Sequence, residues 1–75
     1  MRILIIEDEK LLAETLADII TQNKDIADIC YDGRSGLDHA LSGIYDAVLL
    51  DVMLPGRNGF EVVHQMRKSG NTTPV

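Results

Sequence analysis

Three carboxylates follow two short aliphatic runs of this sequence, and their placement indicates a site at which charge is used. Asp51 ends the run AVLL, while Glu7 and Asp8 follow the run ILII. Runs this apolar are typical of parallel strands buried on both faces, where an isolated charge is costly unless it is paired, hydrogen-bonded or metal-bound. Asp51 therefore either lies at the exposed end of its strand or takes part in a functional site.

Strand-like and helix-like segments alternate along the chain, and the acids fall at their junctions. Short aliphatic and β-branched runs predict strands, whereas apolar residues three or four apart predict helices. The predicted strands are residues 3–6, 25–31 and 47–50, and the predicted helices run from about 9 to 22, from about 34 to 41 and from the N-cap Asn58 to Gly70. The predicted inward-facing residues are Leu12, Leu16, Ile19 and Ile20 on the first helix and Phe60, Val62, Val63 and Met66 on the third.

The alternation of strands and helices predicts an α/β fold with a parallel sheet and right-handed crossovers. In the doubly wound order 2-1-3, the strands that end near Asp8 and Asp51 are neighbours about 4.8 Å apart, with their carboxyl ends on one edge. Glu7, Asp8 and Asp51 are then expected to converge at the switch point of the sheet, where such folds bind ligands.

Three converging carboxylates repel one another, and either raised pKa values or a bound cation relieves the repulsion. Mg²⁺ is the natural cation, because it prefers oxygen ligands and is commonly held by one or two carboxylates together with a phosphate. The acids alone also allow structural readings: Glu7, Asp8 and Glu9 could favour a helix N-terminus, and Asp51 could accept hydrogen bonds from nearby backbone N–H groups. Their combined spacing favours a Mg²⁺-assisted phosphoryl site.

The same residues resemble a known family. Its pattern is carried here by Glu7-Asp8-Glu9, Leu49-Leu50-Asp51, Met53-Leu54-Pro55-Gly56 and Asn58-Gly59. Together they resemble the receiver domain of two-component response regulators, above all the branch that carries a winged-helix DNA-binding domain. The resemblance implies a flavodoxin-like, doubly wound parallel sheet of order 2-1-3-4-5, of which residues 1–75 would supply the part up to the third helix, with a fourth strand only begun at 72–75.

The resemblance also implies a role for each site residue. Asp51 would be the phosphoacceptor, receiving the phosphoryl group from a sensor histidine kinase. Asp8 and Asp51 would bind Mg²⁺ directly, Met53 through its backbone carbonyl and Glu7 through water, and Mn²⁺ would substitute for Mg²⁺. The chain would be a signalling module and not an enzyme, apart from weak self-dephosphorylation in the complete domain, and it would switch an output domain that binds DNA.

Composition limits the setting in which this chemistry occurs. The chain has 75 residues and a net charge of −5, from 12 acidic and 7 basic residues without a basic cluster, so it carries no electrostatic footprint for nucleic acid or an anionic membrane. It shows no signal peptide or membrane span, and its single cysteine, Cys30, fits a reducing compartment, so a cytoplasmic location is expected.

The main departure from the family's pattern is that functional residues expected after the third helix are missing from this sequence. A hydroxyl residue after the fourth strand, a lysine after the fifth and an aromatic switch residue are absent, and neither Thr72, Thr73 nor Lys68 lies where it could replace them. A chain of this size with an open third strand is expected either to stay partly unfolded or to form a two-fold homodimer, by pairing third strands or by exchanging the segment after Gly70. Two other readings remain open at this point: a stand-alone phosphorelay or phosphatase-like metal site, and a receiver fragment without function that dimerises.

Overall fold

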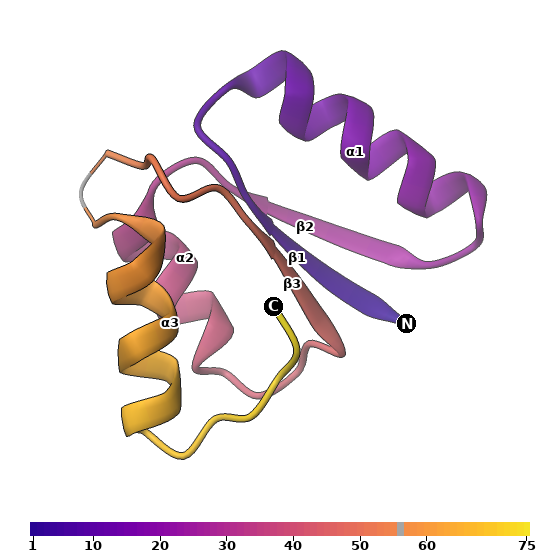
Figure 1. The fold of residues 1–75 in the computed structure, drawn as a ribbon. Helices are drawn as coiled ribbons and strands as arrows, with labels where there is room; N and C mark the ends of the chain where they lie inside the picture. Colours follow the sequence, from indigo (N-terminus) through magenta and orange to yellow (C-terminus); the bar gives the residue numbers. More distant parts are fainter. Residues whose placement is uncertain (56) are drawn as a thin grey trace.

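A three-stranded parallel sheet with helices on both faces forms the protein (Figure 1). The computed structural model describes residues 1–55 and 57–75. In chain order the elements are β1 (Arg2–Ile6), α1 (Lys10–Gln22), β2 (Ile26–Cys30), α2 (Gly33–Ala40), β3 (Ala47–Leu50) and α3 (Gly59–Lys68). The strand order is β2-β1-β3, so the predicted α/β fold, its parallel sheet and its order 2-1-3 are confirmed.

The central strand β1 explains why its sequence is aliphatic throughout. Leu4, Ile5 and Ile6 are fully buried, because β1 pairs with a strand on each edge and is covered on both faces. Successive side chains of a strand point to opposite faces. Leu4 and Ile6 accordingly join the core beneath α2 and α3, while Ile5 joins the core beneath α1.

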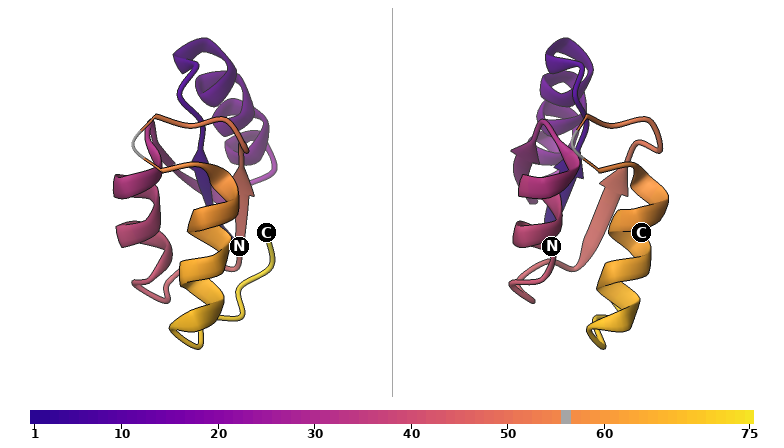
Figure 2. Two further views of the ribbon diagram at one scale, coloured as in Figure 1. Left: turned by 60° about the vertical axis from the view of Figure 1, so that its left-hand side comes forward. Right: turned by 90° about the vertical axis from the view of Figure 1, so that its left-hand side faces the viewer.

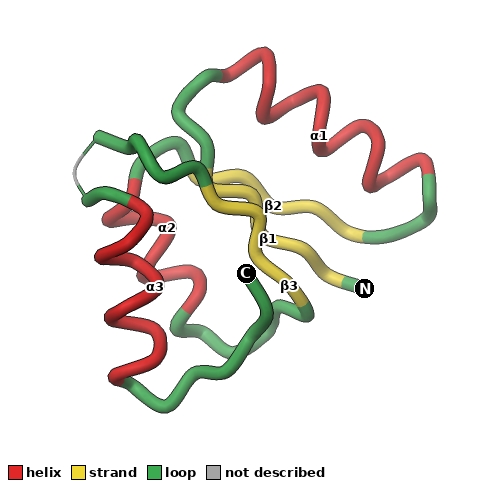
Figure 3. The backbone as a smooth tube through the Cα atoms, viewed as in Figure 1, coloured by secondary structure: helices red, strands yellow, loops and turns green. Residues whose placement is uncertain are grey.

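The helices divide between the two faces of the sheet, as Figures 1 to 3 show. α1 covers one face alone, and α2 and α3 lie side by side on the other. On the two-helix face the core is closed by Val48 of β3 and by Val62 and Met66 of α3. None of the helices in the described ranges is long and apolar enough to cross a membrane.

The buried face of α1 differs from the sequence prediction. Ile20 is buried and Leu16 is partly buried as predicted, but Leu12 and Ile19 are 41% and 53% exposed. The fully buried residue is Ala13, whose small side chain lets the helix lie close to β1 and β2. Because adjacent residues are about 100° apart around a helix, a stripe through Ala13, Leu16 and Ile20 faces the sheet, while Leu12 and Ile19 lie to one side of it, toward solvent.

The prediction that Phe60 faces the core is also wrong, because Phe60 is 73% exposed. Val62 and Met66 are fully buried, and they lie four residues apart on one face of α3. Phe60 and Val62 are two positions apart, a rotation of about 200° around the helix, so both side chains cannot face the same sheet. Val63 is only partly buried.

The last residues of the chain lie along the free edge of β3. Residues 72–75, predicted to begin a fourth strand, do not form a strand. The Val48 N–H nevertheless donates to the Pro74 carbonyl over 2.9 Å. The Asn71 side chain donates to the Ala40 carbonyl over 2.9 Å and so ties this segment to the end of α2.

A polar network closes the end of the sheet opposite the carboxylates. The Tyr45 hydroxyl donates to Asp28 Oδ2 over 2.7 Å, and Arg2 Nη2 donates to the same oxygen over 2.8 Å. Hydrogen bonding from Tyr45, followed by that from Arg2, holds the pKa of Asp28 below its usual value. Burial and the bond to Asp28 raise the pKa of Tyr45 to about 12. The network accounts for the charged residue that interrupts β2, which is an edge strand as predicted.

Candidate metal centre

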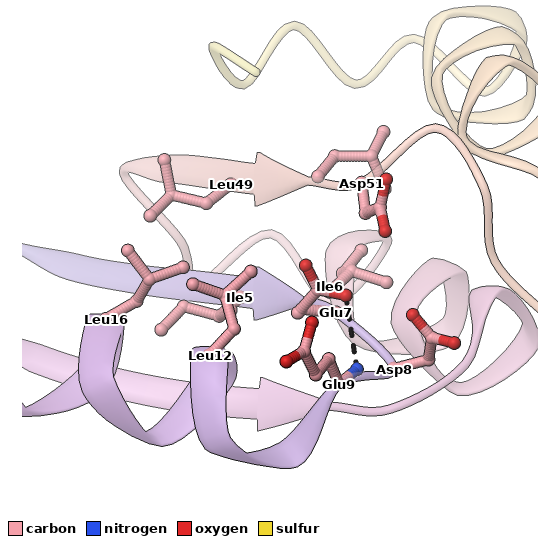
Figure 4. A pocket seen from close by; sticks show the side chains of 10 residues that line it. Ile5, Ile6, Glu7, Asp8, Glu9, Leu12, Leu16, Leu49 and Asp51 are labelled. Carbon is pink, nitrogen blue, oxygen red and sulfur yellow. Dashed lines mark hydrogen bonds between the residues drawn. The ribbon is translucent and has the colours of Figure 1, made fainter.

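The register of β1 with its neighbours brings the predicted carboxylates together. Ile6 is opposite Leu50 in the β1–β3 ladder, and the Asp51 N–H donates to the Ile6 carbonyl over 3.1 Å. Glu7, Asp8 and Asp51 each place a carboxylate oxygen within 4.8 Å of the others. In Figure 4 the carboxylates of Glu7 and Asp51 point into the same space at the ends of β1 and β3.

Glu7 is the buried member of this cluster, with an exposed fraction of 8%. Its Oε2 accepts a hydrogen bond from the Glu9 N–H over 3.2 Å (Figure 4). Burial raises the pKa of the Glu7 carboxyl, and the neighbouring acids Asp8 and Asp51 raise it further, while the Glu9 N–H opposes this rise. The cluster therefore holds unfavourable negative charge that a cation would relieve.

Asp51 is half-buried and Asp8 is exposed, so both carboxylates can be reached from solvent. Asp51 Oδ1 accepts a hydrogen bond from the Met53 N–H over 3.2 Å, which is the local turn that an aspartate commonly makes with the residue two positions on. The Met53 side chain points away from the fold and is largely exposed. The Met53 backbone therefore lies beside the Asp51 carboxylate, and the Met53 side chain takes no part in the site.

The carboxylates form one end of an open cavity of about 580 Å³. Its acidic end is lined by Glu7, Asp8, Glu9 and Asp51, and its apolar end by Ile5, Leu12, Leu16 and Leu49 (Figure 4); Ile6 and Leu50 complete the lining. The exposed Leu12, which the sequence placed in the core, thus lines this cavity. The cavity joins a charged region to an apolar wall between α1 and β3.

Gly59 holds the loop after β3 against the site, a role that the sequence did not reveal. Its N–H donates to the Val52 carbonyl over 2.7 Å, and a Cβ at this position would lie only 2.6 Å from the Asp51 carbonyl oxygen. Asn58, whose side chain accepts from the Glu61 N–H over 2.9 Å, caps α3 as predicted. The Asn-Gly pair marked the helix start, but the close approach of Gly59 to Asp51 depends on the tertiary structure. Gly56, part of the predicted turn, lies outside the described residues.

The donor set suits a hard divalent cation. All the side-chain donors are carboxylate oxygens, which Mg²⁺ and Mn²⁺ accept readily. The ion pairs in residues 1–55 and 57–75 involve Asp25, Asp28 and Glu61, and none of them neutralises the cluster. The residues present therefore fit the cation that the resemblance implies.

The fold and the carboxylate cluster at the carboxyl ends of β1 and β3 define a class: a doubly wound α/β protein with a carboxylate site at the switch point of its sheet. The profile of the family described as the response regulator receiver domain matches residues 3–75. The chain belongs to the response regulator receiver domain family.

Curated relatives support this assignment along the whole chain. The transcriptional regulatory protein DltR of Streptococcus agalactiae is 43% identical over 75 residues, which cover 100% of this chain and 34% of DltR. The response regulator ArlR of Staphylococcus saprophyticus is 48% identical over 75 residues, which cover 99% of this chain and 33% of ArlR. The chain thus spans about a third of the length of these relatives.

Solved structures agree with the fold. The receiver domain of the Francisella response regulator 1452 superposes with a TM-score of 0.94 at 26% identity, covering 99% of this chain and 61% of that domain. The response regulator TrrA from Thermotoga maritima, in complex with Mg²⁺-BeF, gives a TM-score of 0.83 at 36% identity, covering 89% of this chain and 58% of TrrA.

Proposed function

We propose that this chain carries the phosphoacceptor site of a response regulator, with Asp51 as the residue that receives the phosphoryl group. The observation that carries the proposal is the convergence of Glu7, Asp8 and Asp51 within 4.8 Å at the ends of β1 and β3. A cluster of oxygen ligands beside an accessible carboxylate nucleophile is what a metal-assisted phosphoryl transfer requires.

In the proposed reaction a carboxylate oxygen of Asp51 attacks the phosphorus atom of a phosphohistidine on a sensor histidine kinase. The new O–P bond gives an acyl phosphate, while the N–P bond breaks and the imidazole leaves with its electron pair. The Met53 N–H already holds Oδ1 of Asp51, which leaves Oδ2 as the attacking oxygen. Asp51 is only half-buried at the end of β3, so its carboxylate is accessible to the donor.

Mg²⁺, or Mn²⁺ in its place, would be held by the carboxylates of Asp8 and Asp51, by the Met53 carbonyl, and by Glu7 through water. When bound, the ion neutralises charge on the transferring phosphoryl oxygens. The burial of Glu7 suits a supporting role, because the Glu9 N–H already occupies one of its oxygens.

The relatives support the partners that we propose. TrrA has been solved in complex with Mg²⁺-BeF and also together with the histidine kinase ThkA. DltR is a transcriptional regulatory protein and is about three times as long as the matched region. We therefore propose a sensor histidine kinase as the phosphodonor, a cytoplasmic setting, and a DNA-binding winged-helix output domain in the complete regulator. In this role the chain is a switch and not an enzyme.

Self-association of the 75-residue chain is a further part of this proposal. Leu12, Ile19 and Leu49 expose apolar surface on the α1 face, and the outer edge of β3 has a hydrogen bond to Pro74 in place of a full strand. Such surface is commonly covered by another chain. A homodimer should appear in sedimentation across a dilution series, whereas a cooperatively folded monomer at micromolar concentration contradicts it.

Phosphoryl labelling tests the function directly. The complete regulator is incubated with acetyl phosphate and Mg²⁺, and its intact mass and the labelled peptide are read by mass spectrometry. One phosphoryl group should appear on Asp51, and Asp51→Asn should abolish it, whereas the exposed-acid control Asp18→Asn should label normally. Labelling that persists in Asp51→Asn refutes the proposal.

The 75-residue chain is a second arm of the same experiment. It lacks the lysine and hydroxyl residue of the family pattern, and loss of one such stabilising group typically slows reaction by about 10²–10³-fold. We expect slow labelling of this chain, and rapid stoichiometric labelling contradicts that expectation.

A further inference from the structure

The start of α2 lies directly against the loop that follows the phosphoacceptor strand. The Gly33 N–H donates to the Pro55 carbonyl over 3.1 Å. A Cβ at Gly33 would lie 2.1 Å from the carbonyl oxygen of Arg57 and 2.8 Å from its Cβ. These two elements therefore touch through their backbones, at a position where any side chain other than hydrogen is excluded.

The contact cannot be relieved by rotating a side chain, because the nearest atom belongs to the backbone of Arg57. α2 is also held in place from behind. Gly36 packs against β1 so closely that a Cβ there would lie 2.6 Å from Ile6 Cδ1. The Asp32 side chain caps the helix by accepting from the Ser35 N–H over 2.8 Å. A methyl group added at Gly33 must therefore displace the loop rather than the helix.

A displacement at Pro55 and Arg57 reaches the site through a short, hydrogen-bonded backbone. The Pro55 carbonyl also accepts a hydrogen bond from the Arg57 N–H over 3.0 Å, so a shift of Arg57 is passed to Pro55. Met53 lies two residues before Pro55, and its N–H orients the Asp51 carboxylate. At the far end of the loop, the Gly59 N–H donates to the Val52 carbonyl over 2.7 Å, so that end is fixed and a displacement of Pro55 is passed back to Met53.

We propose that Gly33 is a positioning residue of the metal site, which sets the loop so that the Met53 backbone and Asp51 present their oxygens together. This inference rests on the proposed function, because it assigns Met53 to the site. Gly33 touches neither cation nor phosphoryl group and acts only through the loop. Supporting residues of this kind typically contribute about 10–100-fold to metal affinity.

The test is the Mn²⁺ affinity of Gly33→Ala, measured from the electron paramagnetic resonance signal of free Mn²⁺ during titration. Gly33→Ala should bind about tenfold more weakly than the unaltered chain. Gly43→Ala is the matched control. Its φ of 79° makes an alanine there strained as well, but Gly43 lies in the α2–β3 connection and nothing lies within 4 Å of the added Cβ. It should lose stability and keep its affinity, so a purely structural effect is separated from a positioning effect.

Asp51→Asn separates this inference from the proposed function. If Asp51→Asn binds Mn²⁺ as tightly as the unaltered chain, the proposed metal site is wrong. If Asp51→Asn loses binding while folded Gly33→Ala retains full affinity, only the role of Gly33 is overturned. The amide resonance of Met53 should shift in Gly33→Ala and remain in place in Gly43→Ala.

A second variant covers the case in which Gly33→Ala does not fold. Arg57→Gly removes the Cβ that lies 2.8 Å from the added methyl group, while the carbonyl oxygen 2.1 Å away remains and still displaces the loop. The double variant should then fold and bind Mn²⁺ more weakly than Arg57→Gly alone. Equal affinities of the double and single variants overturn the proposal.

Discussion

Replacing Asp51 by asparagine should stabilise the metal-free protein, because it removes one charge from a cluster of like charges. The substitution keeps the shape of the side chain and an Oδ1 that can still accept from the Met53 N–H. What it removes is the repulsion from Glu7 and Asp8. The proposed phosphoacceptor is thus expected to lower the stability of the protein when no cation is bound.

The separation of the carboxylates sets the size of this effect. Two like charges 4.8 Å apart repel by about 0.9 kcal/mol at the permittivity of water and by about 3.5 kcal/mol at an effective value of 20. Asp8 is exposed and salt screens its charge, whereas Glu7 is buried, and this burial raises the pKa of its carboxyl. We expect Asp51→Asn to raise the free energy of unfolding by about 1–2 kcal/mol in chelator.

Urea unfolding followed by circular dichroism is the assay, run in chelator and again in Mg²⁺. Mg²⁺ at ten times its Kd should stabilise the unaltered chain by about 1.4 kcal/mol and leave Asp51→Asn unchanged. Asp18→Asn changes the net charge equally on the exposed surface of α1, and it should shift stability by less than about 0.5 kcal/mol. An Asp51→Asn protein that is less stable than the unaltered chain in chelator refutes the reasoning.

Two further predictions concern the scaffold. The pKa of Tyr45 is raised to about 12, so its contribution to stability is present below the ordinary tyrosine pKa of 10.0 and is lost as the pH rises toward 12. In a Tyr31→Phe background, Tyr45→Phe should lower the free energy of unfolding by about 1 kcal/mol at neutral pH. It should also reduce the loss of stability at alkaline pH. An identical alkaline loss in both proteins contradicts the assignment to Tyr45. Met66→Ala, at a fully buried position, should lower the free energy of unfolding in urea by about 2–5 kcal/mol. Phe60→Ala, at an exposed position, should lower it by less than about 1 kcal/mol. Similar losses in the two variants would contradict the different burial of the two side chains.

The strand order and the convergence of the acids could be predicted because both follow from alternation along the chain. An aliphatic run that ends in an acid locates the carboxyl end of a strand, and the order 2-1-3 then puts Asp8 beside Asp51. The hydrogen bond from Met53 to Asp51 is local and follows from the short spacing.

The helix faces were harder to predict, because the larger side chains suggested the wrong stripe. Ala13 is buried and Leu12 is exposed, since a small residue lets α1 approach the sheet and residue size is a poor guide to which side faces inward. The prediction for Phe60 fails for a similar reason: its hydrophobicity favours the core, but its position on the helix points it away from the face that Val62 buries. The backbone contact of Gly33 with Arg57 joins residues far apart in the sequence, so no local pattern could have revealed it.

The measurement that tests the central claim most directly is Mn²⁺ line-broadening in the amide NMR spectrum of the folded chain. If Glu7, Asp8 and Asp51 form one metal site, broadening should begin at residues 7, 8 and 51–53 and should disappear from these positions in Asp51→Asn. Broadening that is spread over the acidic surface, or that survives Asp51→Asn unchanged, would contradict the account.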